Sequence, residues 1–319
     1  MTLSFLFEQP DRIFTLTRPA WLIAVFCGLA MTPGAAAQQG YKTPQEAIAA
    51  LADAARSGST EMLLAVFGPE GEDIVSSGDD VADAAGRERF VQAYDAKYAL
   101  ELDGDNKAEL ILGEEEWPFP IPLVRKDGAW VFDAEAGRDE ILVRRIGRNE
   151  LSAIQAILAY VDAQNEYAEA ARADNGIATY AQRIVSQPGK KDGLYWPAEL
   201  GGKSPLGDLA AQAAAEGYTA GEERAPFHGY FYKVLRRQGP SASGGAYDYI
   251  AGDKMIGGFA LVAYPAEYEN SGIMTFLVNH EGTIFEKDLG SQTSEIVESM
   301  AEFNPDDTWQ RAKVDDPVE

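Results

Sequence analysis

The chain has 319 residues, a formal net charge of −24 at neutral pH and a single cysteine, Cys27. Because no cysteine follows position 27, the composition excludes disulfide bonds, thiol nucleophiles and thiolate metal sites from the rest of the chain. No basic stripe interrupts the acidic background, which argues against binding to nucleic acid or to an anionic lipid surface.

The first 37 residues have the pattern of a signal peptide. Arg12 and Arg18 precede an apolar stretch over residues 21–31, and three alanines end at Ala37. This stretch is shorter than the about 20 apolar residues that a membrane-spanning helix needs. We therefore expect cleavage after Ala37 and a periplasmic or secreted mature protein without a membrane span. A retained membrane anchor is the alternative.

Helical signals open the segment 38–136. Residues 43–46 combine an N-cap, a proline at the first helical position and a capping-box glutamate, and apolar residues then repeat at helical spacing. A short second helix is predicted over residues 62–67. A polar stretch then leads to a third helix that carries Phe90 and Tyr94.

The pattern next changes to the two-residue period of strands. The predicted strands cover residues 98–102, 107–112, 121–125 and 129–132. Lys126, Asp127 and Gly128 form a hairpin turn signal between the last two. Helices followed by a strand meander predict a small α+β domain over 38–136, with a nuclear-transport-factor-2-like or cystatin-like pattern.

Residues 137–175 carry the longest helical pattern of the chain. Its main apolar stripe consists of Leu151, Ile154, Leu158 and Val161. A helix of this length exceeds the needs of one compact domain, so it is predicted to bridge the first domain and a second one. Arg144, Arg145 and Arg148 argue against insertion of this helix into a membrane.

The second domain is predicted over residues 176–319. A short helix over 177–185, a loop rich in glycine and proline, and an alanine-rich helix over 206–216 come first. Four strands follow at residues 229–236, 257–264, 272–279 and 283–285. The expected fold is therefore α+β, with the long helix packed on an antiparallel sheet.

Several stretches of the chain together resemble one family. They are YKTPQEAIAAL, LLAVFGPEGEDIVSSGD, WVFDAEAGRDEILVRRIGRNEL, KKDGLYWP, GGFALVAYPAEYENSGIMTFLVNHEGTIFEKDLG and FNPDDTWQ. From Tyr41 to Trp309, the chain resembles the exported bacterial family called domain of unknown function 2950. The resemblance implies export and carries no agreed activity.

The second domain also resembles a pilin or pseudopilin headgroup. NELSAIQAILAYVDAQNEYA is similar to the amphipathic half of a pilin's long helix, and GFALVAYPAEYENSGIMTFLVNHEGTIF is similar to the strands that pack on it. The chain departs from pilins because a folded domain precedes the helix and arginines replace its apolar half. The resemblance therefore implies a pilin-like fold and not polymerisation.

The motifs that could carry chemistry are weak. Residues 197–204 end in Gly-Gly-Lys-Ser, but Pro197 stands where a phosphate loop has its first glycine. His228 and His280 could share a transition metal only if their strands are neighbours. The acidic segment from Glu70 to Asp83 leaves calcium as an alternative to simple solvation. We predict no catalytic residue, metal ligand or cofactor.

Aromatic residues in proline-rich loops are the candidate binding residues, namely Trp117, Phe119, Tyr195 and Trp196. The alternative is that these rings cover the ends of the sheets. The sequence favours a non-catalytic binding or assembly module of the cell envelope, with an unknown envelope protein or small ligand as partner. A carboxylate-dependent hydrolase with a cleft between the two domains is the alternative.

Overall fold

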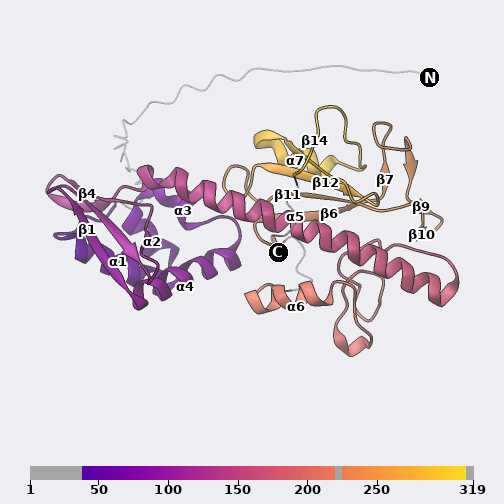
Figure 1. The fold of residues 1–319 in the computed structure, drawn as a ribbon, viewed down its shortest axis with the longest axis horizontal. Helices are drawn as coiled ribbons and strands as arrows, with labels where there is room; N and C mark the ends of the chain where they lie inside the picture. Colours follow the sequence, from indigo (N-terminus) through magenta and orange to yellow (C-terminus); the bar gives the residue numbers. More distant parts are fainter. Residues whose placement is uncertain (1–37, 220–224, 314–319) are drawn as a thin grey trace, which may run out of the picture. The chain divides into compact units, whose positions relative to one another are not determined.

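The computed structural model describes residues 38–219 and 225–313 (Figure 1). It combines α-helices with antiparallel sheets, as the α+β prediction requires. The predicted signal peptide over residues 1–37 lies outside the described residues. Within the described ranges, none of the helices has the length and apolar character needed to cross a membrane.

The first helix begins as its capping signals predict. The Thr43 hydroxyl accepts the Glu46 N–H at 3.2 Å, and Gly58 ends the helix in the left-handed region at φ 68°. The helical elements of this part of the chain are α1 (Pro44–Ser57), α2 (Thr60–Phe67), η1 (Pro69–Gly71), α3 (Glu72–Val75) and α4 (Asp80–Ala96).

The polar, acidic stretch before the third predicted helix, for which the sequence predicts a loop, is largely helical. It forms η1, α3 and the first turns of α4, so the loop prediction is wrong. The reason is local capping, because the Asp79 carboxylate accepts the Ala82 N–H at 3.0 Å and starts α4 earlier than its apolar residues suggest.

A five-stranded antiparallel sheet follows these helices. Its strands are β1 (Tyr98–Asp103), β2 (Lys107–Leu112), β3 (Trp117–Pro118), β4 (Leu123–Lys126) and β5 (Ala129–Phe132), in the order β1-β2-β4-β5 with β3 paired to β2. In β2, Ala108, Leu110 and Leu112 are buried while Lys107 and Glu109 are exposed. This alternation turns one face of the sheet towards a hydrophobic cluster that also contains Ile48, Leu51 and Phe67.

Helix α5 (Ala134–Asn175) contributes to two hydrophobic clusters. Ala134 belongs to the cluster of the first sheet, while Ile154, Ile157 and Tyr160 belong to a second cluster. Leu151, which the sequence places on the buried stripe, is 63% exposed. The buried face is instead centred on Ile157 and includes small and polar residues (Ala153, Ala163, Gln164) that an apolar count overlooks.

The second cluster packs on another five-stranded antiparallel sheet, coloured orange to yellow in Figure 1. Its strands are β6 (Tyr230–Leu235), β11 (Ala260–Pro265), β12 (Met274–Asn279), β13 (Ile284–Asp288) and β14 (Gln310–Arg311), in the order β14-β13-β12-β11-β6. Helix α5 contacts both β11 and β12, and α7 (Thr293–Ser299) contacts β11. Strand β11, which lies between β12 and β6, is accordingly buried along nearly its whole length.

The remaining elements are short. They are η2 (Ala198–Leu200), α6 (Gly207–Glu216), β7 (Arg237–Gln238), β8 (Tyr247–Asp248), β9 (Ile250–Ala251), β10 (Lys254–Met255) and η3 (Gly290–Gln292). Helix α6 matches the predicted alanine-rich helix over 206–216.

The helix predicted over residues 177–185 does not form. Tyr180 and Val185 instead make single β-bridges to Met255 and Tyr195. The buried side chain of Gln164 donates to the Ala181 carbonyl and accepts the Ala181 N–H, both at 2.8 Å. The Gln164 amide thus pairs with the backbone groups that a helix would use itself, which favours the extended conformation.

Two substitutions in α5 test the observed helix face. Ile157→Ala removes a fully buried side chain and should lower the free energy of unfolding by about 3 kcal/mol. Leu151→Ala removes an exposed side chain and should change it by less than about 0.5 kcal/mol. Urea unfolding followed by circular dichroism measures both, and equal losses would contradict this orientation of the helix.

Candidate functional site

A cavity of about 600 Å³ lies among helices α1 to α5 and the ends of β2 and β3. We call it the arginine cavity. Most of its wall is apolar and consists of Leu51, Ala55, Leu63, Phe67, Ile74, Val75, Phe90, Leu112, Trp117, Phe119 and Ile141. A concave apolar wall of this size with a few polar groups is typical of a small-molecule site.

Helix α4 covers this cavity without closing on it. None of its 17 residues is buried, although Val81, Phe90 and Tyr94 are large apolar or aromatic side chains. A helix that is packed directly on a core buries an apolar stripe. The half-buried side chains of α4 are explained by the space beneath it.

Five arginines line the arginine cavity, namely Arg87 and Arg89 from α4 and Arg144, Arg145 and Arg148 from α5. Three carboxylates, those of Asp83, Glu114 and Glu115, also belong to its lining. The lining therefore carries an excess of positive charge in a chain whose net charge is −24. Its electrostatics favour an anion, in contrast to those of the chain as a whole.

Arg145 has a structural role. Its guanidinium donates to the carbonyl of Asp73 at 2.6 Å, to that of Ile74 at 2.7 Å, and to the side-chain oxygen of Asn270. Burial lowers the pKa of Arg145, and the attraction of Asp83 opposes that change. These bonds join α3 to α5 and to the loop before β12, so Arg145 is already fully engaged.

Arg89 and Arg148 differ from Arg145 because, within the described ranges, their guanidinium groups donate to no carbonyl or side-chain acceptor. Neither forms a salt bridge with any carboxylate in the described ranges. Loss of hydration lowers the pKa of Arg148, and repulsion from Arg89 lowers it further. Two repelling guanidinium groups beside an apolar cavity are the arrangement that binds an anionic group.

Asp83 is the half-buried carboxylate of this lining. It accepts the Ser77 N–H at 2.9 Å and the Ser77 hydroxyl at 2.7 Å. Loss of hydration raises its pKa, while the Ser77 hydrogen bonds and the charges of Arg145 and Arg87 counteract the rise. The carboxylate therefore serves to fix the turn before α4.

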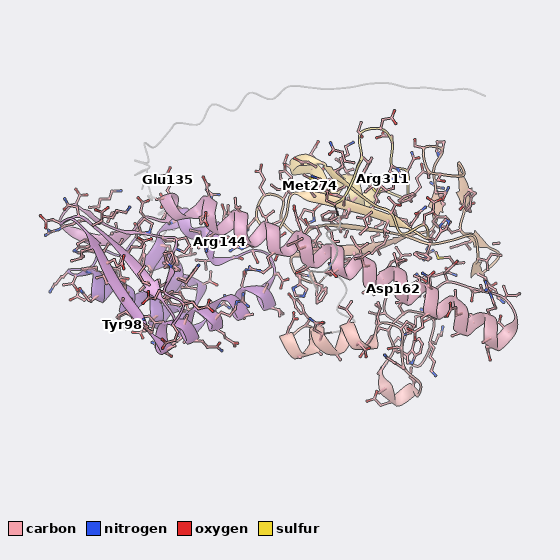
Figure 2. The ribbon with its side chains drawn as sticks, viewed as in Figure 1. Tyr98, Glu135, Arg144, Asp162, Met274 and Arg311 are labelled. Atoms are coloured by element: carbon pink, nitrogen blue, oxygen red, sulfur yellow. The ribbon has the colours of Figure 1, made fainter. Side chains whose placement is uncertain are left out.

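Two of the four predicted binding residues lie in this wall. Trp117 is 39% exposed, and its ring meets that of Phe119 edge-on at 6.1 Å. The guanidinium of Arg144, labelled on α5 in Figure 2, lies 5.6 Å from the Trp117 ring. Phe119 itself is buried and also packs against Phe90 and Phe132.

The other two predicted binding residues lie elsewhere. Tyr195 lines a second cavity, beside α6. The indole N–H of Trp196 donates to the Gly201 carbonyl at 3.3 Å, and Lys191 lies 5.6 Å from its ring. The structure therefore does not gather the four aromatic residues into one site.

The sequence left open a metal site with two histidines. The register places His228, before β6, at the end where Tyr230 pairs with Pro265, whereas His280 follows Asn279 at the end where Asn279 pairs with Ala260. The two histidines therefore lie at opposite ends of the strands and cannot share one ion. In the described ranges, no group of three or more His, Cys, Asp or Glu residues is placed to hold a metal.

The Asp79 carboxylate joins the start of α4 to the start of β6. It is 1% exposed and, besides capping α4, accepts the Tyr218 hydroxyl at 2.9 Å and the Gly229 N–H at 2.8 Å. Gly229 has φ 75°, and a Cβ atom there would lie 2.4 Å from Nδ2 of Asn149. Only glycine fits at this junction.

Substitution of Asp79 tests this junction. Asp79→Ala should lower the free energy of unfolding by about 3 kcal/mol, because it removes a helix cap and leaves two further donors without this acceptor. Asp133→Ala is the matched control, since Asp133 caps α5 through a single bond to the Ala136 N–H and should cost about 1 kcal/mol. Chemical unfolding measures both, and equal losses would show that the bonds to Tyr218 and Gly229 contribute nothing.

Sequence reasoning missed the arginine cavity. In the sequence, Arg144, Arg145 and Arg148 argue against membrane insertion and against the apolar half of a pilin helix, and no motif points to Arg89. A usable signal was present, because three arginines within five residues are unusual in so acidic a chain. What the sequence does not show is that α4 brings Arg89 into the same cavity lining as Arg148.

Comparison with known proteins gives a family and no activity. Residues 38–312 match the family described as "Protein of unknown function (DUF2950)", and the chain belongs to that family. No curated protein and no solved structure matches the chain.

Proposed function

We propose that this member of the DUF2950 family is a non-catalytic binding module that holds an amphiphilic anion in the arginine cavity. The anionic group binds at Arg89 and Arg148, and an apolar chain or ring system lies along the wall that ends at Trp117 and Phe119. The ligand class is thus a molecule with one acidic head and one apolar body.

The observation that carries this proposal is the pair formed by Arg89 and Arg148. Arg144 and Arg148 are four residues apart on one helix face, where like charges destabilise a helix by about 0.2–0.5 kcal/mol. Arg144 is compensated by Glu140 at 2.6 Å, whereas Arg148 meets the further positive charge of Arg89. A bound anion removes this repulsion.

A hydrolase with a pair of carboxylates is the weaker explanation of the same cavity. Acid–base catalysis needs a carboxyl group that is free to exchange a proton with a substrate. Asp83 is occupied by both hydrogen bonds from Ser77. Binding accounts for the uncompensated arginines, and hydrolysis by carboxylates does not.

We also propose that the protein acts outside the cytoplasm, in the periplasm or beyond. Support comes from the signal-like residues 1–37 and from the role of the residue after them. The side-chain amide of Gln38 donates to the carbonyls of Val66 at 3.0 Å and Phe132 at 2.7 Å. Cleavage after Ala37 would keep these contacts of Gln38.

The finer features of the architecture belong to the same proposal. We propose a first domain over 38–136 with a nuclear-transport-factor-2-like or cystatin-like pattern, a bridging helix over 137–175 and a pilin-like domain over 176–319. Separate hydrophobic clusters on the two sheets and the contacts of α5 with β11 and β12 support this division.

Binding of an anilinonaphthalene probe tests the arginine cavity. The anionic dye 8-anilinonaphthalene-1-sulfonate should bind the wild-type protein and be displaced by decanoate but not by 1-decanol, because only decanoate carries an acidic group. The double variant R89Q/R148Q should bind the dye at least about tenfold more weakly, equivalent to about 1.4 kcal/mol. Fluorescence titration measures both effects.

The control variant is R125Q/R172Q, which removes the same charge from two exposed arginines outside the cavity. It should bind the dye as the wild type does. Added salt should weaken binding to the wild type more than binding to R89Q/R148Q, because salt screens the arginine charges. Equal affinities of the two double variants would refute the proposed role of Arg89 and Arg148.

Export can be tested on the full-length chain in a bacterial host. The protein should be recovered from the periplasmic fraction or the medium, and N-terminal sequencing should begin at Gln38. Recovery from the membrane fraction with residues 1–37 attached would support the retained anchor instead.

A further inference from the structure

A second cavity of about 360 Å³ lies between α6, α5 and the strands β6 and β11. We call it the tyrosine cavity. Its volume is within the range of small-molecule sites. Helix α6 resembles α4 in one respect, because it has no buried residue and faces the cavity through half-buried Leu209, Ala210 and Ala213.

Among the described residues, the lining of the tyrosine cavity contains no Asp, Glu, Lys, Arg or His. This is unusual in a chain in which 24% of the residues are charged. An ion held among these described residues would lose its hydration without gaining a countercharge from them, so this part of the lining disfavours charged ligands. The arginine cavity has the opposite selectivity.

Aromatic rings form much of the wall. The ring centroids of Phe231 and Tyr264 lie 5.5 Å apart, and those of Phe227 and Tyr232 lie 6.5 Å apart. Tyr160 and Tyr195 add two more rings, from α5 and from the loop before η2. Rings in such tilted arrangements present faces and edges that favour contact with another aromatic molecule.

Two hydroxyl groups in this wall have only long hydrogen bonds to carbonyl acceptors. The Tyr160 hydroxyl lies 3.4 Å from the Ala260 carbonyl, and the Tyr232 hydroxyl lies 3.5 Å from the Phe227 carbonyl. Hydroxyl–oxygen hydrogen bonds are normally shorter, between about 2.5 and 3.0 Å. The Tyr160 hydroxyl also accepts the Gln164 amide N–H at 2.9 Å, so the Tyr232 hydroxyl is the one available to donate to a ligand oxygen or nitrogen.

We propose that the tyrosine cavity is a second ligand site, and that it binds a small uncharged aromatic molecule. The rings of the wall contact the body of the ligand, and the hydroxyl of Tyr232 orients a polar atom if the ligand carries one. The protein then has two sites of different selectivity, one for an acidic amphiphile and one for a neutral aromatic compound.

N-phenyl-1-naphthylamine is a suitable probe because it has the anilinonaphthalene skeleton of the anionic dye without the sulfonate. The purified wild-type protein should bind it saturably, with enhanced and blue-shifted fluorescence. Ala213→Trp, which fills the cavity from α6, should weaken this binding at least tenfold. Ala214→Trp is the matched control, because Ala214 is the exposed neighbour on α6 outside the lining, and it should bind as the wild type does.

Ala210→Phe is a second filling variant, from one turn earlier in α6, and should also weaken binding of the neutral probe. Circular dichroism and the urea midpoint establish that each variant is folded. The R89Q/R148Q variant should retain the neutral probe, and Ala213→Trp should retain the anionic dye, so that failure of one site is distinguishable from failure of the other. Unchanged binding of the neutral probe to both folded filling variants would overturn the proposal, as would an equal loss in Ala214→Trp.

Discussion

Arg145, Asn149 and Glu150 lie close together on α5, and their polar contacts hold the neighbouring segments against this helix. Arg145 binds the carbonyls at the end of α3, Asn149 donates to the Ser271 carbonyl at 2.9 Å, and Glu150 accepts the N–H groups of Ile273 and Met274 at 3.0 and 2.9 Å. Hydrophobic contact alone would let the helix slide, whereas these directional bonds fix its register. The placement of Arg144 and Arg148 beside the arginine cavity follows from that register.

The two cavities arise from one structural principle. Helices α4 and α6 both lie over apolar walls without burying a residue of their own, so each leaves space beneath it. The charges in the two linings differ, with five arginines in one and, among the described residues, no charged residue in the other. The two sites therefore share a covering helix with no buried residue, and electrostatics determines which molecule each one favours.

The sequence predicts the regular parts of the fold well and the sites poorly. Features that depend on residues close together in the sequence are predicted correctly. The structure confirms the capping signals of α1, the alternation in β2 and the length of α5. The extended conformation of segment 177–185 depends on the side chain of Gln164, and the early start of α4 depends on the Asp79 carboxylate. Each is a single polar side chain, so no periodic pattern in the sequence reveals its effect. Of the predicted binding residues, Trp117 and Phe119 meet in one wall. Arg89 and Arg148 line the same cavity, but they are far apart in the sequence and come together there only through folding.

Gly229 has a consequence for how sequences of this family can diverge. Its N–H bonds Asp79, and the space that a side chain would need is occupied by Asn149. A larger residue at 229 would have to displace the Asn149 amide on α5 and adopt a backbone conformation that side-chain-bearing residues rarely take, at the position whose N–H bonds Asp79. Glycine at 229, aspartate at 79 and asparagine at 149 therefore form a coupled set, and their joint presence identifies the homologues that share this junction.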